Sequence, residues 1–302
     1  MPLPTASQRR PTLLIVGCGD VGLRVLRQLG GRVRVLALSS SPGRREALRA
    51  AGALPLAGNL DHAATLGRLA ALADWVLHLA PPPGEGERDP RTAALLHALA
   101  RSPRVRRVVY ASTSGVYGDA QGARFDETRP VRPASARAKR RVDAEVRLRW
   151  HGRAFGVRAS VLRVPGIYAL DRDGGDPRER LRRGAPLLAP EHDVHTNHIH
   201  ADDLARACIA ALFRGASQRV YHASDDSELT MGEHFDAVAD AFDLARAPRL
   251  PREAMRAAVS EAQWSFLCES RRLDNGRLHR ELRVRLAYPT PGAAWAEARS
   301  KD

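Results

Sequence analysis

The sequence predicts an α/β protein built on a doubly wound parallel sheet, followed by a smaller and mostly helical lobe. Short apolar runs alternate with segments of helical spacing through the first half of the chain, which is typical of a parallel sheet covered on both faces. A glycine-rich turn follows the first apolar run. The chain has 302 residues, 44% of them hydrophobic and 27% charged, which excludes a disordered chain and is enough for one large domain with a smaller partner.

The first half of the chain contains regular β–α repeats. The predicted strands cover Thr12 to Val16, Val33 to Leu38, Ala53 to Leu56, Trp75 to Leu79, Val105 to Ala111 and Ala159 to Val164. The predicted helices between them cover Val21 to Leu29, Arg44 to Ala51, Thr65 to Leu72, Arg91 to Ala100 and Ala134 to Trp150. Repeats of this kind, without an internal sequence repeat of fixed length, favour a doubly wound sheet.

The pattern changes after Pro165, where turn-rich segments replace the regular alternation. We predict a helix over Asp202 to Leu212 with an Asp at its N-cap, a strand over Val220 to Ala223 and a helix over Met231 to Phe242. Residues 1–165 are therefore expected to form the sheet domain and residues 166–302 the smaller lobe. Segments near 194–223 are expected to return to the sheet domain.

Composition argues against several classes of function. The formal net charge of +14 could attract a nucleic acid. However, only two of the 48 basic residues are lysines, and the arginines are spread along the chain. Aromatic residues make up only 5% of the chain, and no zinc-finger or RNP-like pattern is present. We predict no specific nucleic-acid partner. We also predict no membrane span, because no apolar run approaches the roughly 20 residues that one needs.

The chain start and the cysteines suggest a cellular location. Met1 to Pro11 is polar and shows no secretion signal. Cys18, Cys208 and Cys268 are odd in number, far apart and without metal-ligand spacing. We therefore expect a reduced, cytoplasmic protein.

A GxGxxG sequence formed by Gly17, Gly19 and Gly22 stands between the first predicted strand and the first predicted helix. In that context the first glycine permits a tight turn, the second lets backbone approach a pyrophosphate, and the third lets the helix pack closely on the strand. The helix start, at Asp20 and Val21, offers free N–H groups and a positive dipole to an anion. We predict a dinucleotide site that includes these five residues.

The residues after the second predicted strand indicate which dinucleotide binds. An NAD-selective site has an Asp or Glu there to accept from the ribose hydroxyls, but no acidic residue stands between Asp20 and Glu46. The chain instead has Ser39, Ser40 and then Arg44, and hydroxyl and guanidinium groups suit a 2′-phosphate. We predict NADP, with NAD as the alternative. The alternative for Arg44 is an ordinary basic first turn of a helix.

Together with the glycine turn, four segments resemble the short-chain dehydrogenase/reductase superfamily, in its extended branch of NAD(P)-dependent sugar epimerases and dehydratases. They are His78 to Pro82, Ser112 to Gly118 (similar to S-S-x-x-V-Y-G), Val164 to Tyr168 (similar to R-x-x-x-V-Y-G) and Asn197 to Ala205 (similar to N-x-I-H-V-D-D-L-A). The resemblance covers nearly the whole chain. It implies a Rossmann fold for residues 1–165, a cofactor contact at Ala80 and Pro81, and a homodimer.

One part of the family's pattern is missing. In the family, a Tyr four residues before a Lys does the acid–base work, and the Lys holds the nicotinamide ribose. If Glu145 is aligned with the family's trailing Glu, Arg137 takes the Tyr position and Arg141 the Lys position. If Lys139 is aligned as the Lys, Ser135 replaces the Tyr. Neither register supplies a tyrosine, and arginine cannot act as a general base near neutral pH.

The resemblance implies roles for the remaining site residues. Thr113 occupies the family's Ser/Thr position and is expected to hydrogen-bond the reacting oxygen. Tyr117 is the nearest phenol and the candidate replacement acid, with a packing role in the turn as its alternative. For Tyr168, at the edge of the cleft, the same two roles are open. Arg137 or Arg141 is expected to bind a ribose hydroxyl or an anionic substrate, and we assign Arg141 to the cofactor.

Two functions remain open from the sequence. The first is an NAD(P)-dependent oxidoreductase or epimerase/dehydratase-like enzyme that acts on a hydroxyl or carbonyl compound, such as a nucleotide sugar. The alternative is a catalytically inactive NADP(H)-binding sensor or scaffold. The histidines from His192 to His200 lack a converging third ligand, so we predict no metal. Basic residues from Arg178 to Arg183 suggest an anionic ligand, with a solvated helix face as the alternative.

Overall fold

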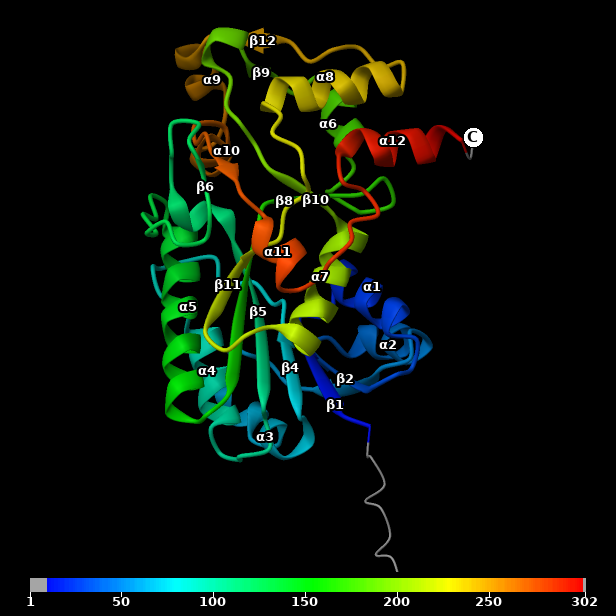
Figure 1. Ribbon diagram of the computed structural model, residues 1–302, viewed down its shortest axis with the longest axis vertical. Helices are drawn as coiled ribbons and strands as arrows, with labels where there is room; N and C mark the ends of the chain where they lie inside the picture. The colour runs from blue at the N-terminus through cyan, green and yellow to red at the C-terminus, as the bar shows by residue number, and fades with distance from the viewer. Residues whose placement is uncertain (1–9, 301–302) are drawn as a thin grey trace, which may run out of the picture.

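Seven parallel strands form the central sheet (Figure 1). In spatial order they are β11 (Arg219–His222), β7 (Arg158–Val164), β5 (Arg107–Thr113), β4 (Trp75–His78), β1 (Thr12–Val16), β2 (Arg34–Ser39) and β3 (Leu54–Ala57). Because β1 lies inside the sheet and the chain winds outward from it in both directions, this is the predicted doubly wound fold. The computed structural model describes residues 10–300, apart from the side chains of residues 70 and 262. Residues 1–9, which make up most of the stretch from Met1 to Pro11 on which the prediction about a secretion signal rests, lie outside the described residues.

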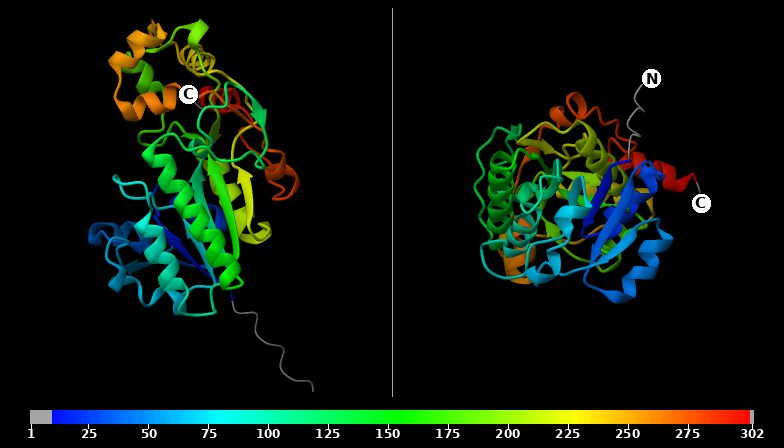
Figure 2. Two further views of the ribbon diagram at one scale, coloured as in Figure 1. Left: turned by 90° about the vertical axis from the view of Figure 1, so that its left-hand side faces the viewer. Right: turned by 90° about the horizontal axis from the view of Figure 1, so that it is seen from below.

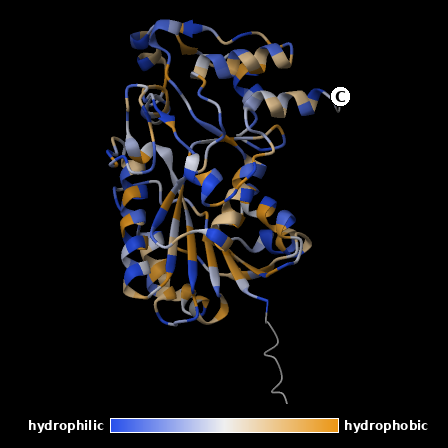
Figure 3. Ribbon diagram, viewed as in Figure 1, coloured by the Kyte–Doolittle hydropathy of each residue, from blue (hydrophilic) through white to orange (hydrophobic). Residues whose placement is uncertain are grey.

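Helices cover both faces of the sheet (Figure 2). On one face lie α1 (Asp20–Leu29), α2 (Arg45–Ala50), α7 (Ala201–Arg214) and α11 (Gly276–Arg280). On the other face lie α3 (Leu69–Leu72), α4 (Pro90–Leu99) and α5 (Ala136–Ala154). All five residues of β1 are buried, with Leu13 and Ile15 in one core and Leu14 and Val16 in the other. Burial on both faces explains why the strands are rich in apolar residues and why β1 continues as an apolar run after Thr12, although β5, β7 and β11 also carry polar residues (Figure 3).

The smaller lobe stands at one end of the sheet (Figure 1). It contains α6 (Pro177–Arg182), α8 (Met231–Ala241), α9 (Arg252–Ala258), α10 (Glu261–Leu267), α12 (Pro291–Arg299), β9 (Leu187–Leu188) and β12 (Arg249–Leu250). Single-turn 3₁₀ helices occur at Pro42–Arg44, Ala63–Leu66, Ser114–Tyr117 and Pro190–His192. Two further parallel pairs join β8 (Gly166–Tyr168) to β10 (His198–His200) and β6 (Arg124–Phe125) to β13 (Arg272–Leu273).

The chain passes between the lobe and the sheet more than once. β11 joins the main sheet beside β7, and α7 packs against α1. The segment that carries β13 and α11 also returns to the sheet, which the sequence did not predict. The helix predicted to start at Asp202 instead begins at Ala201, and its N-cap is His200, whose Nδ1 accepts from the Asp202 N–H. The predicted Asp N-cap is therefore wrong. A division at residue 165 stays a prediction.

The structure also places the ends of α5 and α3 differently from the sequence prediction. α5 begins at Ala136, because the Ser135 hydroxyl accepts from the Ala138 N–H over 3.2 Å, and it runs to Ala154. The helix predicted over Thr65 to Leu72 is two short pieces, a 3₁₀ turn and α3.

Candidate functional site

The glycine turn after β1 has the shape that a pyrophosphate requires. Gly17 has a φ of +83°, and a Cβ there would stand 2.4 Å from the backbone nitrogen of Ala80, so the position requires glycine. α1 begins at Asp20, and no side chain caps it at Gly19. The first-turn N–H groups therefore have no acceptor within the helix. Beyond the adjacent residues, no described atom lies within 4 Å of where a Cβ on Gly19 would stand. Open space beside unpaired donors fits an anion.

A pocket of about 270 Å³ opens beside this turn at the carboxyl ends of β1, β2 and β3. Its walls include Gly17, Ser39, Ser40, Arg44 and Ala80, so the structure brings these predicted cofactor residues together. The Arg44 guanidinium donates over 2.8 Å to a carbonyl oxygen of the glycine turn. Because a guanidinium has five N–H donors, others remain for a ligand.

Asp61 and Arg91 also line this pocket and were not predicted. Arg91 donates to both carboxylate oxygens of Asp61, each over 2.7 Å, and to the carbonyl oxygen of Pro81 over 3.3 Å. The bonds from Arg91 hold the pKa of the Asp61 carboxyl below its usual range. The signal in the sequence was an acidic residue just after the third strand, at the edge where ligands of doubly wound sheets bind.

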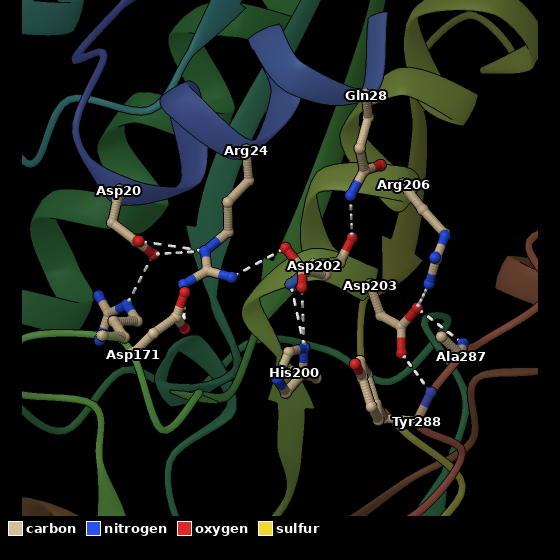
Figure 4. A network of polar contacts seen from close by, with 11 residues as sticks. Asp20, Arg24, Gln28, Asp171, His200, Asp202, Asp203, Arg206, Ala287 and Tyr288 are labelled. Atoms are coloured by element: carbon tan, nitrogen blue, oxygen red, sulfur yellow. Dashed lines mark hydrogen bonds and ion pairs between the residues drawn. The ribbon is translucent and has the colours of Figure 1, made fainter. Parts of the chain in front are cut away.

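The side chain of Asp20 belongs to a polar network rather than to the cofactor pocket (Figure 4). Its carboxylate accepts from Arg24 over 3.1 Å and pairs with Arg172 at 3.2 Å. Arg24, which is 2% exposed, also donates to Asp171 over 2.6 Å and to Asp202 over 2.8 Å. One guanidinium thus joins α1 to the start of α7 and to the loop after β8. Asp20, Val21 and Gly22 can reach a phosphate through their backbone N–H groups only.

A second pocket, of about 460 Å³, lies at the carboxyl ends of β5 and β7, below the lobe. Thr113 and Arg137 line it from the sheet side. Thr113 Oγ1 accepts from the Gly115 N–H over 3.2 Å, which leaves the hydroxyl proton to donate elsewhere. The opposite walls include Arg180, which belongs to the basic stretch for which the sequence suggested an anionic ligand. The other residues of these walls were not predicted as site residues: Met231, Phe235, Gln263, Phe266, Leu267, Glu269 and Arg271.

The structure distinguishes the two alignments of α5 with the family's Tyr and Lys positions, namely Arg137 with Arg141 or Ser135 with Lys139. Arg137 faces the second pocket, and Arg141 donates to the carbonyl oxygen of Ala111 over 2.7 Å. Ser135 is the N-cap, and Lys139 is paired with Glu87 over 2.6 Å at a half-exposed surface position. Arg137 and Arg141 therefore hold the inward-facing positions. Arg141 lines neither pocket, and its assignment to the cofactor stays a prediction.

Tyr117 does not line the second pocket, and its side chain is 1% exposed. Its hydroxyl lies 2.6 Å from Nε2 of His222 and accepts from Arg163 over 2.6 Å. His222 Nδ1 lies 2.8 Å from the carbonyl oxygen of Asp274, so Nδ1 carries the proton and Nε2 accepts from the tyrosine. Burial raises the pKa of Tyr117 to about 12. This geometry favours the packing alternative over the predicted acid.

Arg163, from β7, connects this phenol to a buried carboxylate. It forms two hydrogen bonds to Glu145, of 3.1 and 2.7 Å, and Ser112 donates to the same carboxylate over 2.6 Å. The buried ion pair ties α5 to β7 behind Thr113. Tyr168 is likewise buried, at 3% exposure, and desolvation raises its pKa.

The histidines that precede α7 have separate surroundings. His195 lines the second pocket and lies 3.0 Å from the carbonyl oxygen of Glu228. His198 is buried and stacks on His234, with ring centroids 3.9 Å apart. His200 caps α7. Within residues 10–300, no three His, Cys, Asp or Glu side chains are placed to share a metal ion. No helix in the same range has the length and hydrophobicity of a membrane span.

The fold and the glycine turn define a dinucleotide-binding protein of the doubly wound α/β class. The model of the family described as "NAD dependent epimerase/dehydratase family" matches residues 13–223, and the chain belongs to this family.

Individual relatives agree with this placement. The chain is 25% identical over 284 residues to a Stigmatella aurantiaca protein named 4-hydroxy-2-methyl-3-oxo-4-farnesyl-3,4-dihydroquinoline-1-oxide ketoreductase, covering 88% of this chain and 84% of the relative. It resembles the structure of a functionally unknown conserved protein from Silicibacter pomeroyi, with a TM-score of 0.81, 29% identity and coverage of 96% and 99% of the two chains. It also resembles Thermus thermophilus UDP-glucose 4-epimerase in complex with NAD, with a TM-score of 0.73, 23% identity and coverage of 96% and 99%.

Proposed function

We propose that this protein is an enzyme, an NADP-preferring oxidoreductase or epimerase/dehydratase-like protein that acts on a hydroxyl or carbonyl substrate. The supporting observation is that the two pockets share one edge of the sheet. The first lies at the ends of β1 to β3, and the second, with Thr113, at the ends of β5 and β7. A dinucleotide along this edge would have its adenosine in the first pocket and its nicotinamide toward Thr113.

The preference for NADP rests on the charge of the first pocket. Arg44 and Arg91 line it with the single carboxylate of Asp61, and that carboxylate is paired with Arg91. Arg44 and the hydroxyl of Ser40 are then available to a 2′-phosphate. The Ser39 hydroxyl donates to the carbonyl oxygen of Ser41 over 3.2 Å and would have to turn to reach the same group. NAD, which the related Thermus epimerase structure contains, is the alternative.

The bound cofactor would supply or accept the hydride. The Thr113 hydroxyl would donate a hydrogen bond to the substrate oxygen and so polarise it. The proton for that oxygen would come from water, because Tyr117 is buried and Arg137 cannot release a proton near neutral pH. A nucleotide sugar is one substrate class consistent with this chemistry, since the structural relatives include a UDP-glucose 4-epimerase.

Cofactor selectivity is tested by titrating the protein with NADPH and with NADH and following nicotinamide fluorescence. We expect tighter binding of NADPH, and we expect Arg44→Gln to weaken it by about 10- to 100-fold, the worth of a charge-assisted hydrogen bond. NADH binding should change much less. The exposed Arg49→Gln is a matched control on α2. Equal affinity for both nucleotides, insensitive to Arg44→Gln, would contradict the preference.

Turnover is tested by following NADPH oxidation with a panel of carbonyl compounds and nucleotide sugars. We expect Thr113→Val to reduce turnover by about 100-fold, as removal of one donor to a developing oxyanion does, while NADPH binding is retained. If no member of the panel consumes NADPH faster than buffer, the second candidate is favoured. That candidate, an inactive NADP(H)-binding sensor or scaffold, is suggested by Arg137 and Arg141 at the catalytic positions of α5.

A homodimer is also part of the proposal. Val146, Trp150 and Phe155 on or next to α5 are 59%, 60% and 47% exposed. Neighbouring residues of α4 and α5 form an apolar groove beside Trp150 and Phe155. Exposed apolar surface of this kind is typical of a contact between protein chains.

A further inference from the structure

The second pocket has an excess of positive charge. Its walls carry three guanidinium groups, from Arg137, Arg180 and Arg271, and one carboxylate, from Glu269. Arg271 pairs with Glu269 over 2.6 Å and donates over 2.6 Å to the carbonyl oxygen of Gly118. The only carboxylate in the walls is therefore already used by one arginine, and the charges of Arg137 and Arg180 remain uncompensated there.

Arg137 is held by an aromatic ring rather than by an acid. Its guanidinium carbon lies 3.7 Å from the centroid of the Phe266 ring, a geometry that leaves the N–H edges of the guanidinium free. Among residues 10–300, no carboxylate oxygen forms an ion pair with it within 4.0 Å. Desolvation is the main cause that lowers the pKa of Arg137, opposed by the charge of Glu269. A partly buried cation without a close counter-ion is costly unless a ligand supplies the negative charge.

Arg180 approaches the pocket from the lobe. One of its nitrogens donates to the carbonyl oxygen of Pro186 over 2.7 Å, and the guanidinium carbon lies 5.4 Å from the Phe235 ring centroid. Burial lowers the pKa of Arg180, and the charge of Arg183 adds to that effect. The two arginines thus meet the same pocket from opposite sides, one from α5 and one from α6.

Arg137 also lies close to the residue proposed to hold the reacting oxygen. Thr113 Oγ1 and Arg137 Nη2 lie near one point in space, the position that a Cβ atom would occupy if Gly115 had one. Their distances from that point are 3.6 and 3.9 Å. Both groups can therefore contact neighbouring atoms of one small molecule. Arg137 occupies the helix position where the resemblance would place a tyrosine, so the chain has a fixed cation where relatives would have a phenol.

We infer that the substrate carries a carboxylate or phosphate group within one or two atoms of the reacting carbon, and that Arg137 binds this anion while Thr113 contacts the hydroxyl or carbonyl oxygen. This inference rests on the proposed function for the identity of the reacting carbon. The anion site itself does not depend on turnover. Arg180 contributes a second cation from the lobe side.

The test uses calorimetric titration of the full chain with malonate and, separately, with inorganic phosphate. We expect at least one anion to bind, and we expect Arg137→Gln to weaken its Kd by about 10- to 100-fold, while Arg137→Lys retains part of the affinity. Neutral malonamide should not bind. The matched control is Arg153→Gln, which removes the same charge from an exposed position at the far end of α5 and should change Kd less than about twofold.

The outcomes separate the two proposals. Malonate binding alone assigns a carboxylate, and phosphate binding alone assigns a phosphate. No binding of either anion, or binding that Arg137→Gln leaves unchanged, would overturn the anion site. Circular dichroism of each variant shows whether it has folded. If Arg137→Gln does not fold, the Kd of Arg137→Lys is compared with that of the parent protein instead. NADPH binding is measured on the same samples. Its absence would contradict the proposed function without affecting the result for the anion.

Discussion

Thr113 and Tyr117 lie on the same turn after β5, yet their side chains have different surroundings. Thr113 is partly exposed and lines the second pocket. Tyr117 points into the protein, where Arg163 and His222 hold its hydroxyl. The sequence placed both near the sheet edge correctly, because both follow the same strand. It could not show which one faces the pocket, because that depends on Arg163 of β7 and His222 of β11.

The Tyr117 hydroxyl is expected to contribute to stability and not to turnover. Tyr117→Phe leaves the buried Arg163 and His222 without one partner, which costs about 1–3 kcal/mol in the free energy of unfolding. Urea denaturation measures this loss, and NADPH binding should be unchanged. A variant of normal stability that has lost turnover would restore Tyr117 as the catalytic acid.

His198 is expected to make folding stability depend on pH. Burial lowers its pKa to about 4, whereas an unfolded histidine titrates near 6.5, so its contribution is complete above pH 6.5 and is lost as pH falls toward 4. The parent protein should therefore lose unfolding free energy between pH 7 and pH 5 because His198 takes up a proton on unfolding. In His198→Phe this loss should be smaller by about 2 kcal/mol.

The neighbours of His198 affect the same pH range. Burial also lowers the pKa of His234, which stacks on it, whereas burial raises the pKa of Asp225 to about 7 and so gives the opposite slope. For this reason the measured quantity is the difference between His198→Phe and the parent protein at each pH. The exposed His62→Phe is the control. Identical slopes for the parent and His198→Phe would contradict the prediction.

At the scale of elements, α1 is fixed by polar contacts at its start. Arg24 binds Asp20 within α1, and it connects this helix to α7 through Asp202 and to the loop after β8 through Asp171 (Figure 4). The amide donors expected to hold the pyrophosphate begin at the same turn, so the network positions the cofactor site without contributing a side chain to it.

Arg24→Leu should destabilise the protein and weaken NADPH binding together. Removing the buried guanidinium leaves Asp20, Asp171 and Asp202 facing one another. Because these carboxylates are partly exposed, we expect a loss of about 2 kcal/mol, below the 3–5 kcal/mol typical of fully buried pairs. Thermal unfolding with and without NADPH measures both effects. The exposed Arg27→Leu on the same helix is the control, with an expected change below about 0.5 kcal/mol.

At the scale of the whole molecule, the second pocket requires parts of the chain that are far apart in sequence. Thr113 ends β5, Arg137 opens α5, Arg180 lies on α6 and Phe266 on α10. The sheet supplies a rigid floor, and the lobe supplies the facing wall. The exposed apolar surface around Trp150 lies on the outer face of α5, away from this pocket.

Trp150→Arg is expected to weaken self-association. A charged side chain at the centre of the apolar surface would be buried without a partner in a dimer, which is costly. Sedimentation of the parent protein should give twice the mass of one chain and that of Trp150→Arg a single chain. The control, Arg49→Ala at an exposed position of α2, should sediment like the parent. A parent protein that sediments as a single chain at all concentrations would contradict the homodimer.

The sequence alone determined the doubly wound sheet, the glycine turn and the first-pocket residues Ser39, Ser40 and Arg44. Strand periodicity and glycine spacing are local, and the carboxyl ends of parallel strands meet at one edge whatever the rest of the fold does. Only the tertiary structure decided the pairing of Asp61 with Arg91, the burial of Tyr117 and the pocket wall from residues 263–271. Those features depend on side chains that are distant in sequence meeting in space, and no local pattern encodes such meetings.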